Sequence, residues 1–583
     1  MERVCDTECY RDYWLCSLSD AEGNVRSFEM FEGHDLDRGA LRQLLSQSTI
    51  ITFNGNHYDI PMLSFALEGA TTQELKALSD QIIVGGLKSW QIDSPPLDVD
   101  HIDLFEVAPG MSSLKMYAGK MHANKMQDLP IEPSASIGLF DRIRLREYCE
   151  NDLRGTWLLY DAMSSQIKLR QQMSAEYGVD LRSKSDAQIA ETAMKKILAV
   201  KPKQSVVPAG TTFRYRAPAW LKFVTINILS IVNQSVFEVD ASGYVNMPES
   251  LANRVIHIGQ SKYKMGIGGL HSMEQNVTHV ATDQYRISDH DVASYYPSLI
   301  LETGIFPPQI GMEFQTIYRS WYDRRMAAKA AGDVKNANSL KTLLNGTFGK
   351  LGNRYSIFYA PSELIQVTIT GQLGLLMLIE RLEMCGMRVI SGNTDGVIIK
   401  SRRDMEWLRD DCIRWWENAT GFTTESTEYK LTAQRDVNSY VAITTDGKAK
   451  TKGAYAPPLP GASGWPNPTA QVCATAVVSY LKDGVPIHAT IMQCKDIREF
   501  VTIRNVKGGG VCAGEYLGKA VRWYYAFGSK DFISYKTNGN KVAKTDGCRA
   551  LMTLPDELPT DLDYGWYIRE ARSMLADLGV SIT

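Results

Sequence analysis

Two predicted strands in the second half of the chain end at an aspartate. Residues 289–300 favour a strand that ends at Asp291 and is followed by a turn fixed by Pro297, whose backbone N–H groups can face a polyphosphate. Residues 389–399 contain two apolar runs around a tight polar turn, the pattern of a β-hairpin with Asp395 at its tip. Two such carboxylates can hold a pair of divalent cations. The pattern therefore predicts strands that present a metal centre.

The composition is that of an ordinary globular protein. At about 150 residues per domain, the 583 residues predict about three or four domains. With 44% hydrophobic and 22% charged residues, the chain is neither disordered nor fibrous. The formal net charge of −3 argues against a uniformly basic protein that coats nucleic acid, so a polyanion site must be local. Ten cysteines without a C-x-x-C pair indicate buried reduced thiols.

Membrane and motor functions are disfavoured by what the sequence lacks. No apolar run reaches the ~18 residues of a membrane helix, and Met1–Asp6 lacks the apolar core of a signal peptide. We therefore expect no membrane contact and a cytoplasmic location. No G-x-x-x-x-G-K-[ST] loop is present, which disfavours an ATP-driven motor.

A second group of carboxylates lies near the N-terminus. Asp6 and Glu8 are two residues apart on a predicted strand, so both project from one face and can share a metal ion, although an exposed strand end has the same pattern. Asp59 follows an apolar strand, and Asp152 shares a helix side with Tyr148, four residues before it. Four carboxylates from three segments suit two cations that hydrolyse a phosphodiester, with Tyr148 orienting the attacking water.

The order D-x-E, N-x-x-x-Y-D and Y-x-x-x-D resembles the proofreading 3′→5′ exonuclease domain of DNA polymerases, in the DEDDy form with a tyrosine in its third motif. The resemblance implies that the four carboxylates are catalytic metal ligands and that the tyrosine is catalytic: Asp6, Glu8, Asp59, Asp152 and Tyr148. It implies contacts with single-stranded DNA at Asn54, Tyr58, Ser113 and Leu114. Lys125 matches a catalytic lysine of phage exonucleases only weakly, and a surface lysine is the favoured interpretation.

Three strings in the second half resemble the motifs of family B DNA polymerases. Residues 291–300 resemble D-x-x-S-L-Y-P-S-I-I, with Tyr295 and Leu299 as departures. Residues 341–349 resemble K-x-x-x-N-S-x-Y-G, with Gly346 and Phe348 as departures. Residues 393–396 resemble the hairpin motif D-T-D-S, with Asn393 and Gly396 as departures.

This second resemblance implies a nucleotidyl-transfer site. Its catalytic metal ligands would be Asp291 and Asp395, with Val292 as a further metal ligand. Nucleotide contacts would come from one face of a predicted helix, which carries Lys341, Asn345 and Phe348 at helical spacing, and from Tyr296 as a steric gate against a ribose 2′-OH. Arg325 is either a second clamp for the triphosphate or a surface arginine.

Further matches imply contacts with primer–template DNA. They are Gly268 and Gly269 before the first polymerase motif, Thr368 in a T-x-x-G-R-like string with Gln372 for Arg, Tyr440 in a K-x-Y-like string with Asn438 for Lys, and Lys452. Residues 498–549 carry ten Lys/Arg against four Asp/Glu, interleaved with aromatic residues. This local basic-aromatic patch, which includes Arg522, is a candidate thumb.

The resemblance implies an α/β and α+β multidomain fold, with a ribonuclease H-like exonuclease domain and a right-hand polymerase. The expected parts are an exonuclease domain (1–165), a connecting region with the N-terminal part of the palm (166–285), the palm with the first polymerase motif (286–305), fingers (306–358), the palm with the catalytic hairpin (359–457) and a thumb (458–583).

The implied activity is template-directed DNA synthesis from deoxynucleoside triphosphates, with proofreading, in bacteriophage replication. We expect two Mg²⁺ per active site, replaceable by Mn²⁺, and a monomer in the cytoplasm of a bacterial host. Its expected partners are primer–template DNA and a helicase, single-strand binding protein or processivity factor. Fifty residues separate Asp291 from Lys341, and 54 separate Lys341 from Asp395. These gaps leave little room for the insertions of protein-primed phage polymerases, which predicts a nucleic-acid primer and poor unaided strand displacement.

Two alternatives remain open at the level of sequence. In the first, the protein is a 3′→5′ exonuclease whose polymerase half has become a DNA-binding module, as the departures at Asn393, Gln372 and Asn438 suggest. In the second, it is a replisome scaffold that binds DNA without Mg²⁺-dependent chemistry. Primer extension separates both alternatives from the polymerase.

Overall fold

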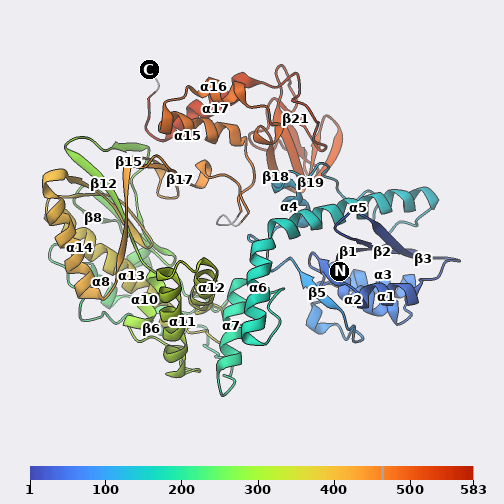
Figure 1. The fold of residues 1–583 in the computed structure, drawn as a ribbon, viewed down its shortest axis with the longest axis horizontal. Coiled ribbons are helices and arrows are strands. Elements are labelled where there is room, and N and C mark those ends of the chain that lie inside the picture. The colour runs from blue at the N-terminus through green and yellow to red at the C-terminus, as the bar shows by residue number, and fades with distance from the viewer. Residues whose placement is uncertain (461–464, 582–583) are drawn as a thin grey trace. The chain divides into compact units, whose positions relative to one another are not determined.

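The computed structural model describes residues 1–460 and 465–581, which divide into two compact units (Figure 1). Unit 1 comprises Met1–Ser185, Pro457–Val472 and Ile491–Ile568. Unit 2 comprises Asp186–Ala456, Cys473–Thr490 and Arg569–Thr583. Residues 458–583, which the sequence assigns to one thumb, are therefore divided between the two units.

Unit 1 contains a mixed five-stranded sheet in the order β3-β2-β1-β4-β5. Its strands are β1 (Glu2–Cys9), β2 (Tyr13–Ser19), β3 (Val25–Phe31), β4 (Thr49–Thr52) and β5 (Asp100–Asp103). Strand β1 pairs antiparallel with β2 and parallel with β4. The predicted strand that carries Asp6 and Glu8 is thus present as β1, and the apolar strand before Asp59 is present as β4.

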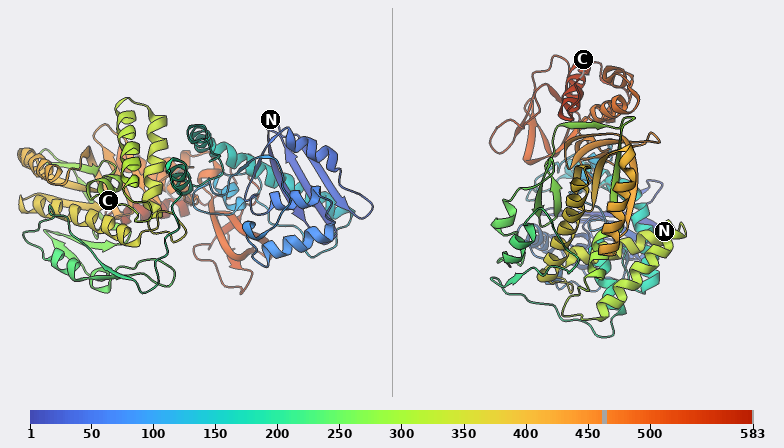
Figure 2. Two further views of the ribbon diagram at one scale, coloured as in Figure 1. Left: turned by 90° about the horizontal axis from the view of Figure 1, so that it is seen from below. Right: turned by 90° about the vertical axis from the view of Figure 1, so that its left-hand side faces the viewer.

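Helices cover both faces of this sheet (Figures 1 and 2). Alternate residues of β1 point to opposite faces, so Cys5 joins a core with α1, α2 and α3, whereas Val4 joins a core with α4, α5 and α6. The helices are α1 (Arg38–Ser46), α2 (Asp59–Leu67), α3 (Thr72–Ile83), α4 (Leu114–Lys120), α5 (Leu139–Ala162) and α6 (Ser164–Tyr177). This layering brings α5 against β1, which positions the N-terminal carboxylates.

The rest of unit 1 is built on a four-stranded sheet in the order β20-β18-β19-β21. Its strands are β18 (Thr502–Cys512), β19 (Glu515–Tyr525), β20 (Ile533–Tyr535) and β21 (Cys548–Ala550). The basic-aromatic patch falls here, but Phe500 and Trp523 are fully buried, while Tyr516, Phe527 and Phe532 are exposed. Only part of the aromatic pattern therefore marks a surface.

Unit 2 is organised around a ten-stranded sheet whose main order is β17-β16-β15-β12-β14-β13-β10-β9-β8, with β11 paired to β15. Its strands are β8 (Ile256–Ile258), β9 (Ser261–Gly266), β10 (Gly269–Ser272), β11 (Val277–Val280), β12 (Tyr285–Val292), β13 (Arg388–Asn393), β14 (Gly396–Arg402), β15 (Thr424–Asp436), β16 (Ser439–Thr444) and β17 (Ala449–Lys452). Neighbouring strands of this sheet pair antiparallel. The hairpin expected at 389–399 is present as β13 and β14.

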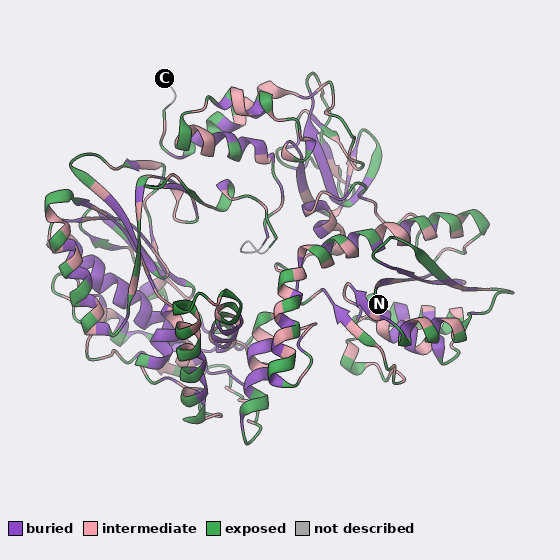
Figure 3. Ribbon diagram, in the orientation of Figure 1, coloured by how far each residue is buried: buried purple, intermediate pink, exposed green. Residues whose placement is uncertain are grey.

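Helix α13 (Pro361–Met384) packs against β10 and β13 and forms the core of unit 2 (Figure 3). By length and composition alone α13 could cross a membrane, but 78% of its most apolar 18-residue window is buried inside the fold. A helix that is apolar on all sides is also what a buried core helix requires. We therefore interpret α13 as the core helix of this sheet.

The predicted helix that carries Lys341, Asn345 and Phe348 is present as α12 (Val334–Lys350) and follows a separate helix, α11 (Glu313–Ala330). Helix α11 ends before Gly332, whose φ of +70° favours glycine, and α12 begins after Asp333. The Asp333 carboxylate accepts the Asn336 N–H and caps α12. One glycine and one capping aspartate therefore mark the chain reversal between α11 and α12. The spacing of hydrophobic residues does not reveal this reversal.

The turn after Asp291 also differs from the expectation. It is made at Ser294, with φ +51° and ψ +47°, and Pro297 lies in the first turn of α10 (Tyr295–Glu302), where its missing N–H costs nothing. The remaining elements are β6 (Thr212–Arg214), β7 (Val236–Glu238), α7 (Asp186–Ile197), α8 (Ile228–Gln234), α9 (Glu249–Ala252), α14 (Glu406–Thr420), α15 (Gln471–Asp483), α16 (Ile487–Gln493), α17 (Tyr564–Asp577) and the 3₁₀ turns Ser89–Gln91, Arg403–Met405, Gly453–Tyr455 and Ile497–Glu499.

Candidate active sites

Three carboxylates converge in unit 1. Asp6 and Glu8 project from β1, Asp152 comes from α5, and their ligand oxygens all lie within 4.8 Å of one another. Carboxylate oxygens at this spacing fit a hard divalent cation such as Mg²⁺. The chemistry of this donor set therefore agrees with the metal that the exonuclease motifs imply.

Burial raises the pKa of each carboxyl in this cluster, and repulsion from the other carboxylates raises it further for Asp6 and Glu8. For Glu8, burial and then the charge of Asp152 raise the pKa to about 8, against a smaller lowering by Lys115. For Asp152, burial raises the pKa to about 6. For Asp6, burial and the charge of Glu8 raise it well above its usual value. The folded chain thus holds negative charges that a bound cation would relieve.

Asp59 lies beside this cluster but is held by β1. Its Oδ1 accepts the Thr7 N–H at 3.0 Å and the Thr7 hydroxyl at 2.6 Å, and the residue is buried. Burial raises its pKa to about 7, and its charge raises the pKa of both Asp6 and Glu8. The structure thus brings three of the four expected ligands into one group and places the fourth next to them.

The segment before Asp59 is a turn fixed through its backbone. Asn54 has a positive φ of 67°, and its N–H donates to Asp103 Oδ1 at 2.8 Å. A Cβ at Gly55 would overlap the Thr52 side chain, so the turn requires glycine there. Tyr58 is an expected contact with single-stranded DNA, and its hydroxyl is hydrogen-bonded to Ser79 Oγ at 2.8 Å.

Lys115 is the residue of this site that the sequence analysis missed. Its Nζ lies 4.8 Å from the centre of the Tyr148 ring and 3.1 Å from Asp128 Oδ1, and its charge lowers the pKa of Glu8 and Asp152. Burial and then the charge of Asp152 raise the pKa of the Tyr148 hydroxyl. Lys115 directly follows the Ser113-Leu114 pair, and that adjacency is the signal that could have found it.

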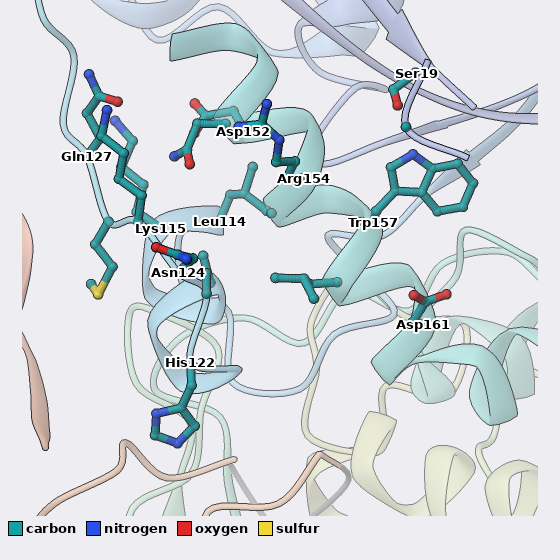
Figure 4. Close-up of a pocket in the computed structure, with 18 of the residues that line it drawn as sticks. Ser19, Leu114, Lys115, His122, Asn124, Gln127, Asp152, Arg154, Trp157 and Asp161 are labelled. Carbon is teal, nitrogen blue, oxygen red and sulfur yellow. The ribbon is translucent and has the colours of Figure 1, made fainter. Parts of the chain in front are cut away.

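A cavity of about 730 Å³ adjoins this cluster, and all its lining residues belong to unit 1 (Figure 4). Asp152, Arg154 and Trp157 lie along α5 on one side of it, and Lys115 faces them from α4. Of the other expected residues, Leu114 and Lys125 line the same cavity, and Ser113 caps α4 by accepting the Met116 N–H. The cavity is large enough for a nucleotide beside the carboxylates.

In unit 2, Asp291 and Asp395 lie side by side at the end of neighbouring strands. Asp291 on β12 is paired with Gly396, and the Val292 N–H donates to the Asp395 carbonyl at 2.7 Å. A Cβ at Gly396 would overlap Asp291 Oδ1 as that side chain is placed here. Both aspartates line a cavity of about 410 Å³, together with Tyr440, Lys450 and Lys452.

Lysines moderate the charge of this second pair. Burial and then Asp289 raise the pKa of Asp291 to about 6, and Lys450 acts against them. Burial raises the pKa of Asp395, and Lys452 lowers it. The sequence analysis did not identify Lys450, which lies on β17 and is 161 residues away from Asp289, its ion-pair partner. The oxygen donors of Asp291 and Asp395 suit Mg²⁺ here as well.

The expected nucleotide contacts gather around Tyr296. The Tyr296 ring stacks on Phe348 with centroids 4.1 Å apart, and its hydroxyl donates to the Gly268 carbonyl at 3.2 Å. Lys341 and Asn345 are exposed on α12, the helix that carries Phe348. Arg325 is half-buried and donates to the Ser294 hydroxyl, in the turn that follows Asp291.

The departures from the family motifs have structural partners. Gln372 is buried, accepts the Gly266 N–H at 3.0 Å and donates to the Gly266 carbonyl at 2.8 Å. It therefore joins α13 to the β9–β10 hairpin, where Gly269 packs against Thr394. Asn393 Nδ2 donates to the Val437 carbonyl at 3.3 Å.

Two expected DNA contacts are buried in this fold. Arg522 is fully buried, and its guanidinium donates to the backbone carbonyls of Ala123, Asn124, Leu551 and Met552. Thr368 is also buried, and its hydroxyl donates to the Leu364 carbonyl. Neither side chain has surface left for a phosphate. Tyr440 and Lys452, in contrast, are paired in register on β16 and β17 and line the cavity.

No protein-family model matches the chain, and no curated protein matches it. Among solved structures, the chain is similar to the family B DNA polymerase from the hyperthermophilic archaeon Pyrobaculum calidifontis. The sequences are 13% identical, the TM-score is 0.43, and the match covers 100% of this chain and 78% of that chain.

Proposed function

We propose that this protein is a DNA-directed DNA polymerase of family B with a 3′→5′ proofreading exonuclease. The observation that carries the proposal is the placement of Asp291 and Asp395 on neighbouring strands at one cavity. The ring stack also brings together Tyr296 and Phe348, two residues for which the motifs imply nucleotide contacts. These groups belong to strings that resemble the family in the same order along the chain.

In the synthesis site, Asp291 and Asp395 would hold two Mg²⁺, or Mn²⁺ in their place. When bound, the metal would lower the pKa of the primer 3′-OH and neutralise the triphosphate. Lys341, Asn345 and Arg325 contact the triphosphate, and the Tyr296–Phe348 stack excludes a 2′-OH. Tyr440, Lys452, Gly268 and Gly269 contact the primer–template.

In the exonuclease site, Asp6, Glu8, Asp152 and Asp59 would hold two further cations. The Tyr148 hydroxyl, which lies on the same helix as Asp152 and whose pKa is raised by burial and by the Asp152 charge, orients the attacking water. Lys115 supplies positive charge where the scissile phosphate becomes more negative. Asn54, Ser113 and Leu114 contact the single strand. The mixed sheet of unit 1, with helices on both faces, supports a ribonuclease H-like domain.

The biological setting follows from the same resemblance. We propose a monomeric replicative enzyme of a bacteriophage, active in the cytoplasm of the bacterial host on nucleic-acid primers. The connections between Asp291 and Lys341 and between Lys341 and Asp395 contain only α10, α11, α12, α13, β13 and loops among the described residues. This supports poor strand displacement by the protein alone, with a helicase or processivity factor assisting.

Primer extension tests the polymerase proposal directly. The wild type should extend a primer on a template with Mg²⁺ and four deoxynucleotides, and Asp395→Ala should lower the rate by at least roughly a thousandfold because one of two metal-binding carboxylates is lost. The alternative, an exonuclease with a degenerate polymerase half, predicts shortening of the primer and no extension. Extension that Asp395→Ala leaves unchanged would contradict the assignment of this residue.

A further inference from the structure

One lysine that lines the cavity of unit 2, Lys450, belongs to none of the strings that resemble the family B motifs. Lys450 Nζ lies 3.0 Å from Asp289 Oδ2 and 3.5 Å from Asp291 Oδ2. Strands β16 and β15 separate β17, which carries Lys450, from β12, which carries both aspartates. The Lys450 backbone pairs with Ala442 of β16, and its side chain reaches over the face of the sheet to this pair of carboxylates.

Asp289 anchors that cation. Its side chain is only 8% exposed, and its Oδ2 accepts a hydrogen bond from the Tyr429 hydroxyl at 2.7 Å in addition to the contact with Lys450. A buried carboxylate that loses its cation is strongly destabilising, so Lys450 is held in place. Asp291, two residues later on the same strand face, is 51% exposed and remains open to a ligand. The arrangement is one buried anion that fixes an ammonium group beside an accessible carboxylate.

We propose that Lys450 is a positioning residue for DNA synthesis, which orients the Asp291 carboxylate and sets how strongly the Asp291–Asp395 pair attracts divalent cations. This inference rests on the proposed polymerase function. Lys450 lines the same cavity as Asp395, so its charge opposes the entry of a second cation. Asp289 moderates that opposition because it neutralises most of the Lys450 charge.

The two side chains therefore have opposite expected effects on metal affinity. Lys450→Met removes a positive charge and leaves Asp289 unpaired, so divalent cations should bind about tenfold more tightly while maximal extension slows, because Asp291 loses its orienting partner. Asp289→Asn leaves the Lys450 charge without its buried anion, so cations should bind about tenfold more weakly. Lys450→Arg keeps the charge and should remain near the wild-type affinity.

The experiment measures Mn²⁺ binding to the full chain by electron paramagnetic resonance. The background carries Asp6→Asn and Glu8→Gln, which remove the cluster of unit 1. The Mg²⁺ concentration that gives half-maximal primer extension is measured in parallel for the same variants. Lys448→Met is the matched control, because Lys448 is 82% exposed, pairs with Asp446 and lies outside the cavity lining. Thermal unfolding checks that each variant folds, and Lys450→Gln, which keeps a donor to Asp289, replaces the methionine variant if that one does not.

Opposite shifts of Mn²⁺ affinity in the Lys450 and Asp289 variants, with no shift in Lys448→Met, support the inference. Unchanged affinity, or shifts in one direction for both variants, overturns it, because a lysine that only stabilises the fold would change the unfolding temperature and not the metal affinity. Mn²⁺ binding does not require synthesis. Opposite shifts in a protein that extends no primer would therefore contradict the proposed function alone, whereas extension without these shifts would contradict the inference alone.

Discussion

The two carboxylate clusters of this protein differ in how their charge is balanced. In unit 1, Asp6, Glu8 and Asp152 crowd together, and the nearby Lys115 forms its ion pair with Asp128, outside the cluster. In unit 2, Asp291 is already in contact with Lys450, which the buried Asp289 holds in place. The pKa is raised to about 8 for Glu8 of unit 1, and to about 6 for both Asp152 of unit 1 and Asp291 of unit 2.

Similar acidic motifs therefore do not make equivalent candidate metal sites. A cluster whose nearby lysine pairs with another carboxylate gains most from a bound metal, because the metal relieves repulsion that folding has imposed. A cluster with a fixed lysine gains less, but its carboxylate is oriented before the metal arrives. We therefore expect the exonuclease and the synthesis activities to respond independently to substitutions and differently to pH.

The substitutions with the largest expected effect are in the carboxylate cluster of unit 1. Asp6→Ala with Glu8→Ala removes two of the three converging carboxylates, so degradation of a 5′-labelled single strand without nucleotides should fall by at least roughly a thousandfold. Primer extension should stay within about twofold of the wild type, since the synthesis carboxylates are on other strands. Glu32→Ala, at an exposed glutamate of unit 1, is the control. Equal loss of both activities would point to a folding defect or a wrong assignment.

Lys115→Met tests what the lysine near the unit 1 cluster contributes, in contrast to Lys450, which is held beside Asp291 in unit 2. Loss of the ammonium beside Tyr148 and Asp152 should lower the rate of 3′-end degradation by about 10- to 100-fold, as removal of one charged stabiliser of a transition state does. Lys125→Met is the matched control and should change the rate by less than about twofold. If Lys125→Met has the larger effect, the lysine that weakly matches the family motif is the functional one.

Tyr296→Ala tests the nucleotide contact that only unit 2 has. Without the ring that stacks on Phe348, incorporation of ribonucleotides relative to deoxynucleotides should rise by about 10- to 100-fold, because the steric barrier to a 2′-OH is removed. Tyr296→Phe keeps the stack and loses only the hydrogen bond to Gly268, so it should retain wild-type sugar selection. Unchanged selection in Tyr296→Ala would remove the proposed gate.

The smallest expected effect is on the free energy of unfolding, measured with a chelator that removes divalent cations. The Glu8 pKa is raised from 4.5 to about 8, so the folded state binds more protons than the unfolded state between these values. The contribution of this group to the free energy of unfolding is therefore complete below about pH 4.5 and lost as pH rises through about 8. Chemical denaturation across this range should show a fall that is smaller in Glu8→Gln and that Mg²⁺ suppresses. If the stability of the wild type and of Glu8→Gln depends on pH in the same way, the raised pKa of Glu8 in the folded cluster is contradicted.

Local patterns predicted what depends on neighbours in sequence. Strand alternation placed Asp6 and Glu8 on one face, and two apolar runs around a polar turn placed Asp395 at a hairpin tip, both as observed. Helical spacing placed Phe348 on a face with Lys341. These features depend on periods of two and 3.6 residues, which a sequence displays directly.

Contacts between distant segments were not predictable in the same way. Lys450 meets Asp289 across 161 residues, and Arg522 meets Ala123 across 399. A lysine in a charged strand and an arginine in a basic patch look exposed until the fold brings their partners to them. The sequence therefore predicts a DNA contact at Arg522, whereas in the structure its guanidinium donates to backbone carbonyls.

The central claim is that acidic residues of this chain form two separate centres for divalent cations, and anomalous diffraction from crystals of the full chain grown with Mn²⁺ tests it most directly. The account predicts anomalous peaks within about 2.5 Å of carboxylate oxygens at two places, between Asp291 and Asp395 and among Asp6, Glu8 and Asp152. Mn²⁺ at the second place and none at Asp291 and Asp395, with primer–template and a nucleotide bound, would contradict it.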